Sequence, residues 1–248
     1  MKVLGIIPAR YSSTRFPGKP LVVINGKSMI RRVCEQALSC TGLSEVIVAT
    51  DDLSIENHVT SFGCKVMMTS ASHRSGTERC SEVCETLRSR GMEYDVIVNI
   101  QGDEPYIHPG QIEQVIECFS LKEAMIVTLM KKITSAEELL NPDVVKALAG
   151  IHGKALYFSR AAVPFVRGVE TAEWTGLHNF FKHIGIYGYR PDVLKEIVKL
   201  PPSALETAES LEQLRWLEND FDIILKETAY ESVAIDSPGD LLKLTNRG

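Results

Sequence analysis

Three cations, several hydroxyl groups and a glycine gather in one loop near the N-terminus. Arg10, Arg15 and Lys19 follow the short apolar run 3–8. Guanidinium and ammonium groups bind phosphate oxygens, and Gly18 allows the backbone to approach a ligand closely. A solvated basic loop has the same composition, so both interpretations stay open for the loop alone. If it binds a ligand, its chemistry favours a polyanion such as a nucleoside triphosphate.

A second polar segment, 72–79, reads Ser-His-Arg-Ser-Gly-Thr-Glu-Arg and leads into a predicted helix. The free N–H groups at a helix start suit an anion or the carbonyl of a base. Capping by Ser75 and Glu78 explains part of the segment but not the whole octet. Ligand binding and pure capping therefore both remain open.

Two further segments end a predicted strand in a carboxylate. Asp103 and Glu104 stand beside Gly102 in 99–105, and Asp236 ends the run 233–235. Carboxylate oxygens are natural ligands for Mg²⁺. Taken alone, a plain acidic turn is the better interpretation of Asp103, and a helix cap is the better interpretation of Asp236. If the two aspartates meet across one site, they are predicted to hold a metal ion against a triphosphate.

A polar cluster in the C-terminal half has the chemistry of a site for an acidic, hydroxyl-rich molecule. It consists of Arg160, His183, Tyr187, Glu212 and Gln213. Positions 183, 185 and 187 point to one face of a predicted strand, and Gly185 is expected to leave room between the two polar rings. Such a face can line a pocket for an acidic, hydroxyl-rich molecule whose carboxylate pairs with Arg160. A core histidine and tyrosine with satisfied hydrogen bonds are the alternative.

The elements that must position these residues alternate along the first half of the chain. Predicted strands at 3–8, 45–50 and 65–69 alternate with predicted helices at 29–40, 54–62 and 76–90. The continuous apolar runs 46–49 and 96–98 indicate strands buried on both faces. The pattern predicts an α/β fold, Rossmann-like, with a mixed and mostly parallel sheet flanked by helices. Ligands of such sheets bind at the carboxyl ends of the strands, where the polar segments lie.

The pattern becomes less regular from about residue 154. Strand-like runs at 155–159 and 183–189 are followed by a predicted helix over 205–218. We expect a single domain over 1–248 with a smaller irregular subdomain at about 154–220. The segment 167–177 is the best candidate for a mobile surface loop, and its Trp174 is either partly exposed or a core anchor.

Composition excludes several classes of protein. A formal net charge of −5 argues against a general nucleic-acid binder. No apolar run approaches the roughly 20 residues that cross a bilayer, so no membrane span is expected. The six cysteines form no C-x-x-C pair, which favours buried reduced thiols in a cytoplasmic protein over a zinc or redox site.

Together the segments resemble one family, the CMP-Kdo synthetases or 3-deoxy-manno-octulosonate cytidylyltransferases. The residues that carry the resemblance lie at 7–11, 13–15, 17–21, 47–51, 75–79, 98–105, 155–160, 183–189, 211–215 and 236–238. The opening loop is shared by many nucleotidyltransferases. Tyr-Phe-Ser-Arg at 157–160, His-x-Gly-x-Tyr-Gly-Tyr at 183–189 and Leu-Glu-Gln-Leu-Arg at 211–215 point to this family. The match covers nearly the whole chain, and 166–177 carries no recognised pattern.

The resemblance implies a nucleotide-diphospho-sugar transferase fold and an activity. The reaction would transfer CMP from CTP to 3-deoxy-D-manno-octulosonate (Kdo) with release of pyrophosphate, and would serve lipopolysaccharide synthesis. It further implies a Mg²⁺ cofactor, a cytoplasmic location and a homodimer formed through the irregular C-terminal part. The alternative is a cytidylyltransferase for another sugar acid, such as a sialic acid or a Kdo analogue.

The resemblance also assigns roles to individual residues. The catalytic set that it implies is Arg10, Arg15, Lys19, Asp103 and Asp236, with the two aspartates as Mg²⁺ ligands. The nucleotide-binding set is Pro8, Ala9, Arg10, Lys19, Arg74, Ser75 and Gln101. The sugar-binding set is Arg160, His183, Tyr187, Glu212 and Gln213.

Overall fold

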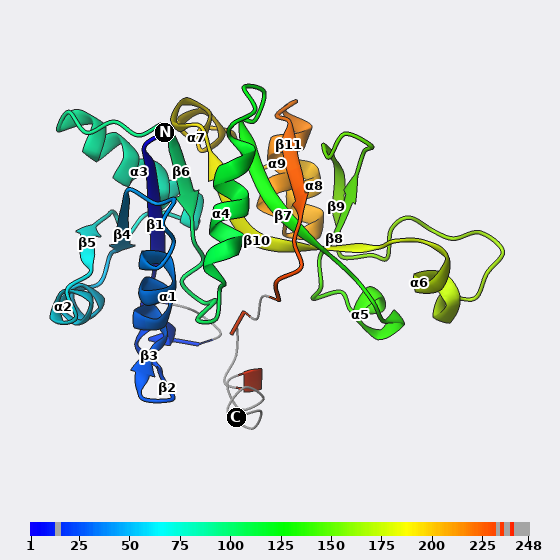
Figure 1. The fold of residues 1–248 in the computed structure, drawn as a ribbon, viewed down its shortest axis with the longest axis horizontal. Helices are drawn as coiled ribbons and strands as arrows, with labels where there is room; N and C mark the ends of the chain where they lie inside the picture. Colours follow the sequence, from blue (N-terminus) through cyan, green and yellow to red (C-terminus); the bar gives the residue numbers. More distant parts are fainter. Residues whose placement is uncertain (13–15, 232–233, 236–238, 241–248) are drawn as a thin grey trace.

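The computed structural model describes residues 1–12, 16–231, 234–235 and 239–240. Their main sheet runs in the order β11-β7-β10-β6-β1-β4-β5, and β8 and β9 extend it beside β10 (Figure 1). Its strands are β1 Val3–Ala9, β4 Glu45–Thr50, β5 Lys65–Met68, β6 Val96–Asn99, β7 Ile126–Lys132, β8 Lys146–Ala149, β9 Ala155–Ser159, β10 Phe181–Tyr189 and β11 Ile223–Glu227. A separate two-stranded sheet joins β2 Val23–Ile24 to β3 Lys27–Ser28.

The strand directions confirm the predicted mixed, mostly parallel sheet. β1 lies parallel to both β4 and β6, β4 to β5, and β7 to β11. β10 is antiparallel to β6 and β7 on either side of it, and the hairpin of β8 and β9 is antiparallel as well. The carboxyl ends of β1, β4 and β6 therefore meet at one edge of the sheet, and the loops that follow them can form one site.

Helices cover both faces of the sheet, which explains why its strands are apolar on both sides. The helices are α1 Met29–Leu38, α2 Leu53–Ser61, α3 Gly76–Ser89, α4 Pro109–Cys118, α5 Ala136–Leu140, α6 Trp174–Leu177, α7 Pro191–Ile197, α8 Ala204–Glu209 and α9 Glu212–Glu218, with 3-10 turns at Lys19–Leu21 and Thr171–Glu173. α1, α2 and α4 pack in one core cluster, and α3, α7 and α9 pack in the other. Alternate residues of β1 show the division, because Val3 and Ile7 join the first cluster and Leu4 and Ile6 the second.

The helix predicted over 205–218 is wrong as one element. The chain forms α8 and α9 instead, because Ser210 adopts a left-handed backbone with φ 52° that ends α8. Because of this break α9 is a separate helix, and Glu212 and Gln213 are its first two residues. β10 also begins two residues earlier than predicted, at Phe181.

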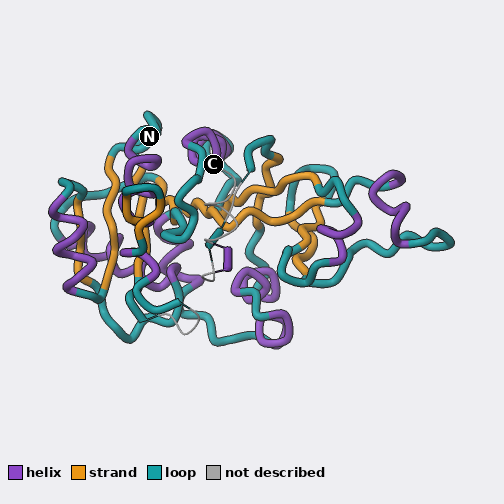
Figure 2. Tube along the Cα trace, turned by 90° about the horizontal axis from the view of Figure 1, so that it is seen from below, coloured by secondary structure: helices purple, strands orange, loops and turns teal. Residues whose placement is uncertain are grey.

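The irregular part of the chain has a small core of its own. α5, α6 and their connecting loops extend to one side of the molecule, far from β5 (Figures 1 and 2). Trp174 is 3% exposed in this core, stacks on Phe180 and donates its indole N–H to the carbonyl of Val169 at 3.0 Å. Trp174 is therefore a core anchor, and the loop expected over 167–177 is organised around it.

Candidate functional site

The described part of the opening loop contains a turn at Gly18, directly before Lys19. Gly18 has φ 69°, a left-handed conformation that favours glycine, and its N–H donates to the carbonyl of Tyr11 at 2.9 Å. Lys19 follows directly, and its Nζ lies 2.8 Å from Oδ2 of Asp103. The ion pair is partly exposed to solvent, with the two side chains 13% and 28% exposed. The first and third polar segments thus meet, as their positions at strand ends predicted.

The loop after β6 touches three other parts of the site. A Cβ at Gly102 would lie 2.6 Å from the carbonyl oxygen of Pro8, so only glycine lets this loop rest on the end of β1. Gln101 donates its side-chain amide to the carbonyl of Gly185 in β10 at 3.0 Å. The carbonyl of Asp103 accepts the N–H of Ile235 at 3.0 Å. Ile235 immediately precedes Asp236 in the chain, so the fourth polar segment approaches the third.

The start of α3 packs against the opening loop and the end of β1. Ser75 is the N-cap and accepts the N–H of Glu78 at 3.2 Å. Arg10 donates to the carbonyl of Arg74 at 3.1 Å, so the segment also contacts the opening loop. Gly76 faces Pro8, because a Cβ there would lie 3.3 Å from Cγ of the proline. Ser75 therefore caps α3, and the same segment also contacts the opening loop and the end of β1.

Arg74 itself is engaged along α3. Its guanidinium donates to Oε1 of Glu78 at 2.9 Å, and its side chain is 66% exposed. In this arrangement the main chain of Arg74, rather than its side chain, contacts Arg10. Pro8 and Ala9, the other expected neighbours of the nucleotide, end β1.

The two polar rings of β10 lie together on one face, as expected. The ring centroids of His183 and Tyr187 are 5.3 Å apart, although the pairing of β10 with β7 shifts register between Ile184 and Tyr187. Thr128 of β7 fills this bulge, because its hydroxyl lies 2.7 Å from the carbonyl of Ile186 and 3.0 Å from Nε2 of His183. The bulge aims the neighbouring carbonyl of Gly185 at the loop after β6.

The expectation that Gly185 leaves room between the rings is wrong. A Cβ at Gly185 would lie 3.6 Å from both Cγ of Gln101 and Oε1 of Glu104. The register shift redirects this position toward the loop after β6, and the two rings approach each other without it. The space at Gly185 is thus occupied by the loop after β6.

Burial controls protonation in the expected sugar cluster, which consists of Arg160, His183, Tyr187, Glu212 and Gln213. Burial lowers the pKa of His183 to about 3, so its imidazole is neutral at physiological pH. Burial also raises the pKa of Tyr187, whose hydroxyl is buried without a hydrogen-bond partner among the described residues. Burial raises the pKa of Glu212, and hydrogen bonds from the hydroxyls of Thr77 and Ser75 oppose this rise. The cluster therefore offers neutral donors and acceptors around one partly desolvated carboxyl.

Glu212 connects α9 to the start of α3. Thr77 in the first turn of α3 donates to Oε2 of Glu212 at 2.7 Å, and Arg215 donates to Oε1 at 3.0 Å. Gln213, next on α9, is 6% exposed. The helix break at Ser210 makes this contact possible, because α9 starts independently of α8.

Arg160 lies at the end of β9 with its guanidinium on main-chain oxygens. Nε donates to the carbonyl of Glu209 at 2.7 Å and Nη1 donates to the carbonyl of Pro142 at 3.0 Å. Within the described part of the chain, the guanidinium forms no ion pair with a carboxylate. The carboxylate of Glu209 instead accepts the main-chain N–H of Arg160 and the hydroxyl of Ser159. The charge of Arg160 is therefore available to an anionic ligand.

Comparisons with known proteins agree with this geometry. Residues 4–224 match the cytidylyltransferase family. The chain is 53% identical to the 3-deoxy-manno-octulosonate cytidylyltransferase of Parabacteroides distasonis over 98% of this chain and 96% of that protein. The protein belongs to this family. The corresponding protein of Cytophaga hutchinsonii is 49% identical over 99% of this chain and 97% of its own.

Solved structures give the same answer for this cytidylyltransferase. A CMP:2-keto-3-deoxy-manno-octonic acid synthetase in complex with CTP is 40% identical, with a TM-score of 0.91 over 100% of this chain and 98% of that one. A putative glucose-1-phosphate thymidylyltransferase from Bacillus anthracis is 15% identical, with a TM-score of 0.65 over 99% and 94% of the two chains. At this low identity, the second structure is similar to this chain only in its fold, which is that of the nucleotidyltransferases.

Two residues expected in the site, Arg15 and Asp236, lie outside the described residues. Among the residues that the structure does describe, no three histidine, cysteine, aspartate or glutamate side chains gather closely enough to hold a metal ion. Sequence reasoning missed Thr128 and Glu209, which hold His183 and the end of β9. Thr77 stood in the quoted segment 75–79, but nothing in its spacing linked it to Glu212, which is 135 positions away.

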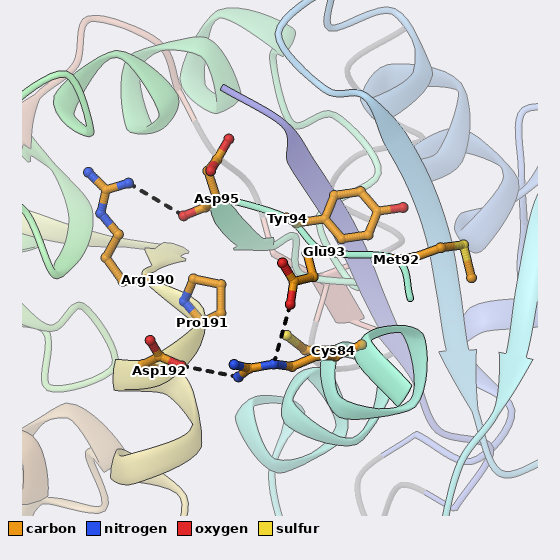
Figure 3. A pocket seen from close by; sticks show the side chains of 9 residues that line it. Cys84, Met92, Glu93, Tyr94, Asp95, Arg190, Pro191 and Asp192 are labelled. Carbon is orange, nitrogen blue, oxygen red and sulfur yellow. Dashed lines mark hydrogen bonds and ion pairs between the residues drawn. The ribbon is translucent and has the colours of Figure 1, made fainter. Parts of the chain in front are cut away.

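A separate cavity of about 280 Å³ lies at the opposite end of β6 (Figure 3). Asp95 just before β6 and Arg190 just after β10 line it, together with Arg88 and Asp192. Both arginines have partners there: Arg88 pairs with Asp192 at 3.2 Å, and Arg190 donates to the main-chain carbonyl of Asp95 at 3.4 Å. This cavity is distinct from the candidate site and supplies control positions for the experiments below.

The low pKa of His183 predicts a specific loss of stability in acid. The unfolded chain binds a proton at this group below about pH 6.5, whereas the folded chain does so only near pH 3. The free energy of unfolding therefore falls as the pH falls from 6.5 toward 3, by up to about 1.4 kcal/mol per pH unit, and this group has no effect above 6.5. Urea unfolding of the wild type and His183→Gln at about pH 7.5 and about pH 5 measures it. We expect the wild type to lose about 2 kcal/mol more than the variant; equal losses would contradict the burial of a neutral imidazole.

Proposed function

We propose that this protein transfers CMP from CTP to Kdo, releases pyrophosphate and so activates Kdo for lipopolysaccharide synthesis. The observation that carries the proposal is the joining of two half-sites. Lys19 on the opening loop reaches Asp103, Gln101 on the same loop as Asp103 reaches β10, and α3 reaches Glu212. The phosphate-binding chemistry and the sugar-acid chemistry thus lie side by side, in a chain whose relatives are named for this reaction.

The transfer requires the anomeric hydroxyl oxygen of the sugar acid to attack the α-phosphorus of CTP in line. A new oxygen–phosphorus bond forms while the bond from the α-phosphorus to the pyrophosphate oxygen breaks, and the proton of the attacking hydroxyl is released to solvent. Such reactions depend chiefly on positioning and charge neutralisation. Arg10, Arg15 and Lys19 bind the triphosphate and stabilise the charge that develops on the leaving pyrophosphate. Nucleotide contacts are expected from Pro8, Ala9, Arg74, Ser75 and Gln101.

We propose Asp103 and Asp236 as the residues that hold Mg²⁺. Mg²⁺ is commonly held by one or two carboxylates together with substrate phosphates, so a three-residue protein cluster is not required. Two observations support the assignment: Asp103 already carries a cation, the ammonium of Lys19 at 2.8 Å, and the residue before Asp236 is hydrogen-bonded to Asp103. When bound, the ion would neutralise phosphate charge and polarise the α-phosphate. Lys19 would then release Asp103 and bind the triphosphate.

For the acceptor we propose a site over 154–220 made by Arg160, His183, Tyr187, Glu212 and Gln213. The guanidinium of Arg160 pairs with the carboxylate of the sugar acid. Neutral His183 and the unpartnered hydroxyl of Tyr187 bind its hydroxyl groups. Glu212 and Gln213 accept or donate on the side that faces the nucleotide. The chain as a whole forms one nucleotidyltransferase domain in this proposal.

Replacing Arg160 by alanine is expected to raise the KM for Kdo by about tenfold to a hundredfold while the KM for CTP stays unchanged. The reason is that the acceptor carboxylate loses its charged partner, whereas the triphosphate is bound at the other half-site. Steady-state pyrophosphate release measures both constants. Arg88→Ala, at the separate cavity, is the control and is expected to change neither. An unchanged KM for Kdo would contradict the assignment of Arg160.

We further propose a cytoplasmic homodimer. Large apolar side chains are exposed on the irregular part of the chain, among them Phe165 at 74% and Leu177 at 64%, and pairing of this region would cover them. Five of the six free cysteines are buried and the sixth is half-buried, which suits a reducing compartment. Among the described helices, none has the length and apolar character to cross a bilayer.

A panel of acceptors tests the proposed function. Pyrophosphate release is measured with CTP and Mg²⁺ in the presence of Kdo, a Kdo analogue or a sialic acid. We expect the highest kcat/KM with Kdo. A higher value with a sialic acid would replace the acceptor in the proposal and leave the cytidylyl transfer itself in place.

A further inference from the structure

A buried lysine lies behind the sugar-acid residues and has no role in the reaction described above. Lys146 begins β8 and is 0% exposed. Its Nζ donates to the carbonyl oxygens of Asn141 at 2.9 Å and Val144 at 2.5 Å. Burial and the charge of Arg160 lower the pKa of Lys146, and Glu209 opposes them. A buried ammonium group is costly unless it is hydrogen-bonded, so its retention here points to a task.

The carbonyl partners of Lys146 belong to a short segment, 141–145, that also holds two residues of the sugar cluster. Arg160 donates its Nη1 to the carbonyl of Pro142 at 3.0 Å. The main-chain N–H of His183 donates to the carbonyl of Val145 at 2.8 Å. Along the segment, carbonyls that accept hydrogen bonds from Lys146 thus alternate with carbonyls that accept them from Arg160 or His183. Movement of this segment would shift Arg160 and His183 together.

The strand register places the lysine between the same two residues. β8 pairs with β9 so that Lys146 lies opposite Ser159, the residue before Arg160. On its other side Lys146 pairs with Lys182, the residue before His183. The ammonium of Lys182 is directed elsewhere, to Glu138 at 2.6 Å. Lys146 is therefore a buried cation between the strand that precedes Arg160 and the strand that carries His183.

We propose that Lys146 is a positioning residue for the acceptor: it fixes the segment 141–145 and thereby holds Arg160 and His183 in the arrangement that binds the carboxylate end of the sugar acid. The inference rests on the proposed function, which assigns that carboxylate to Arg160. Lys146 does not touch the substrate, because its side chain has no exposed surface. A neutral side chain leaves the carbonyls of Asn141 and Val144 without their donor, and the segment relaxes.

Lys146→Met tests the proposal, because methionine keeps most of the length and removes the donors. We expect the KM for Kdo to rise by about tenfold, with the KM for CTP changed by less than about twofold. Lys154→Met is the matched control: Lys154 lies at the turn of the same hairpin, is 52% exposed and pairs only at the surface with Asp222. It is expected to change neither constant. Equal rises in both KM values, or no rise for Kdo, would overturn the proposal.

A double-variant cycle separates positioning from a general loss of structure. Because Lys146 acts through Arg160 as well as His183, Lys146→Met is expected to raise the KM for Kdo by a smaller factor in an Arg160→Ala background than in the wild type. Full additivity of the two effects would overturn the proposal. Lys146→Gln, which keeps amide donors, provides the same readouts if the methionine variant does not fold, and its increase in KM is expected to be smaller. Wild-type turnover with Kdo is measured first: its absence would reject the proposed function, whereas normal wild-type turnover with unaffected variants would reject only the role of Lys146.

Discussion

Asp103→Asn is expected to reduce kcat roughly a thousandfold or more while the fold is kept. A neutral amide is a poor ligand for Mg²⁺. The variant would therefore hold the proposed Mg²⁺ ion less tightly, and the triphosphate charge near the reacting phosphorus would be less neutralised. Asp103 is 28% exposed as a side chain, and losing its ion pair with Lys19 is expected to affect stability little. Steady-state pyrophosphate release and a thermal unfolding curve, recorded on the same preparation, measure the two effects.

A Mg²⁺ titration makes this prediction specific to the metal. The variant is expected to need a higher Mg²⁺ concentration for its residual activity, because one of two carboxylates is lost. Asp222→Asn is the control, since Asp222 is a 58% exposed carboxylate paired with Lys154 at the β8–β9 turn. A normal rate in Asp103→Asn would refute the metal assignment.

Arg79→Met is expected to lower the free energy of unfolding by about 3–5 kcal/mol. Arg79 on α3 is 0% exposed, and its Nη2 lies 3.0 Å from Oδ2 of Asp51, directly after β4. Its other guanidinium contact is the hydroxyl of Thr69, directly after β5. Removal of the arginine leaves the carboxylate of Asp51 without its partner in a shielded position. Urea unfolding at neutral pH measures the loss.

An exposed ion pair provides the contrast for Arg79. Arg31 and Glu35 pair at 3.0 Å on the surface of α1, with side chains 44% and 41% exposed. Arg31→Met is expected to cost at most about 0.5 kcal/mol. The double variant Arg79→Met with Asp51→Asn is expected to be more stable than Arg79→Met alone, because the unpaired carboxylate is gone. If Arg79→Met loses no more than Arg31→Met, the buried pair does not contribute as described.

The parallel half of the sheet could be predicted because each strand there is a continuous apolar run with a helix after it. That pattern specifies burial on two faces, and it correctly brought the end of β1 and the end of β6 to one edge, where Lys19 meets Asp103. The roles of single residues followed from the family resemblance. Spacing alone left two interpretations open for the opening loop and for the capped helix, and it favoured a plain acidic turn for Asp103.

The rest of the site depends on contacts that local patterns do not encode. The bulge in β10 requires the hydroxyl of Thr128 on a neighbouring strand, so the use of the space at Gly185 was mispredicted. The break between α8 and α9 depends on one left-handed serine, Ser210, a residue type that gives no strong signal for it. Lys146 was missed because a lysine in a strand is expected to be exposed. The folded structure shows that Lys146 is buried and that its ammonium is hydrogen-bonded to the carbonyls of Asn141 and Val144.

One measurement tests the central claim most directly. The protein is incubated with Kdo, Mg²⁺ and CTP that carries a label on its α-phosphorus, and the products are separated. The proposed reaction predicts that the label appears in a CMP–Kdo conjugate, in an amount equal to the pyrophosphate released. Label that remains in free CMP or in CTP while Kdo is unchanged would contradict it.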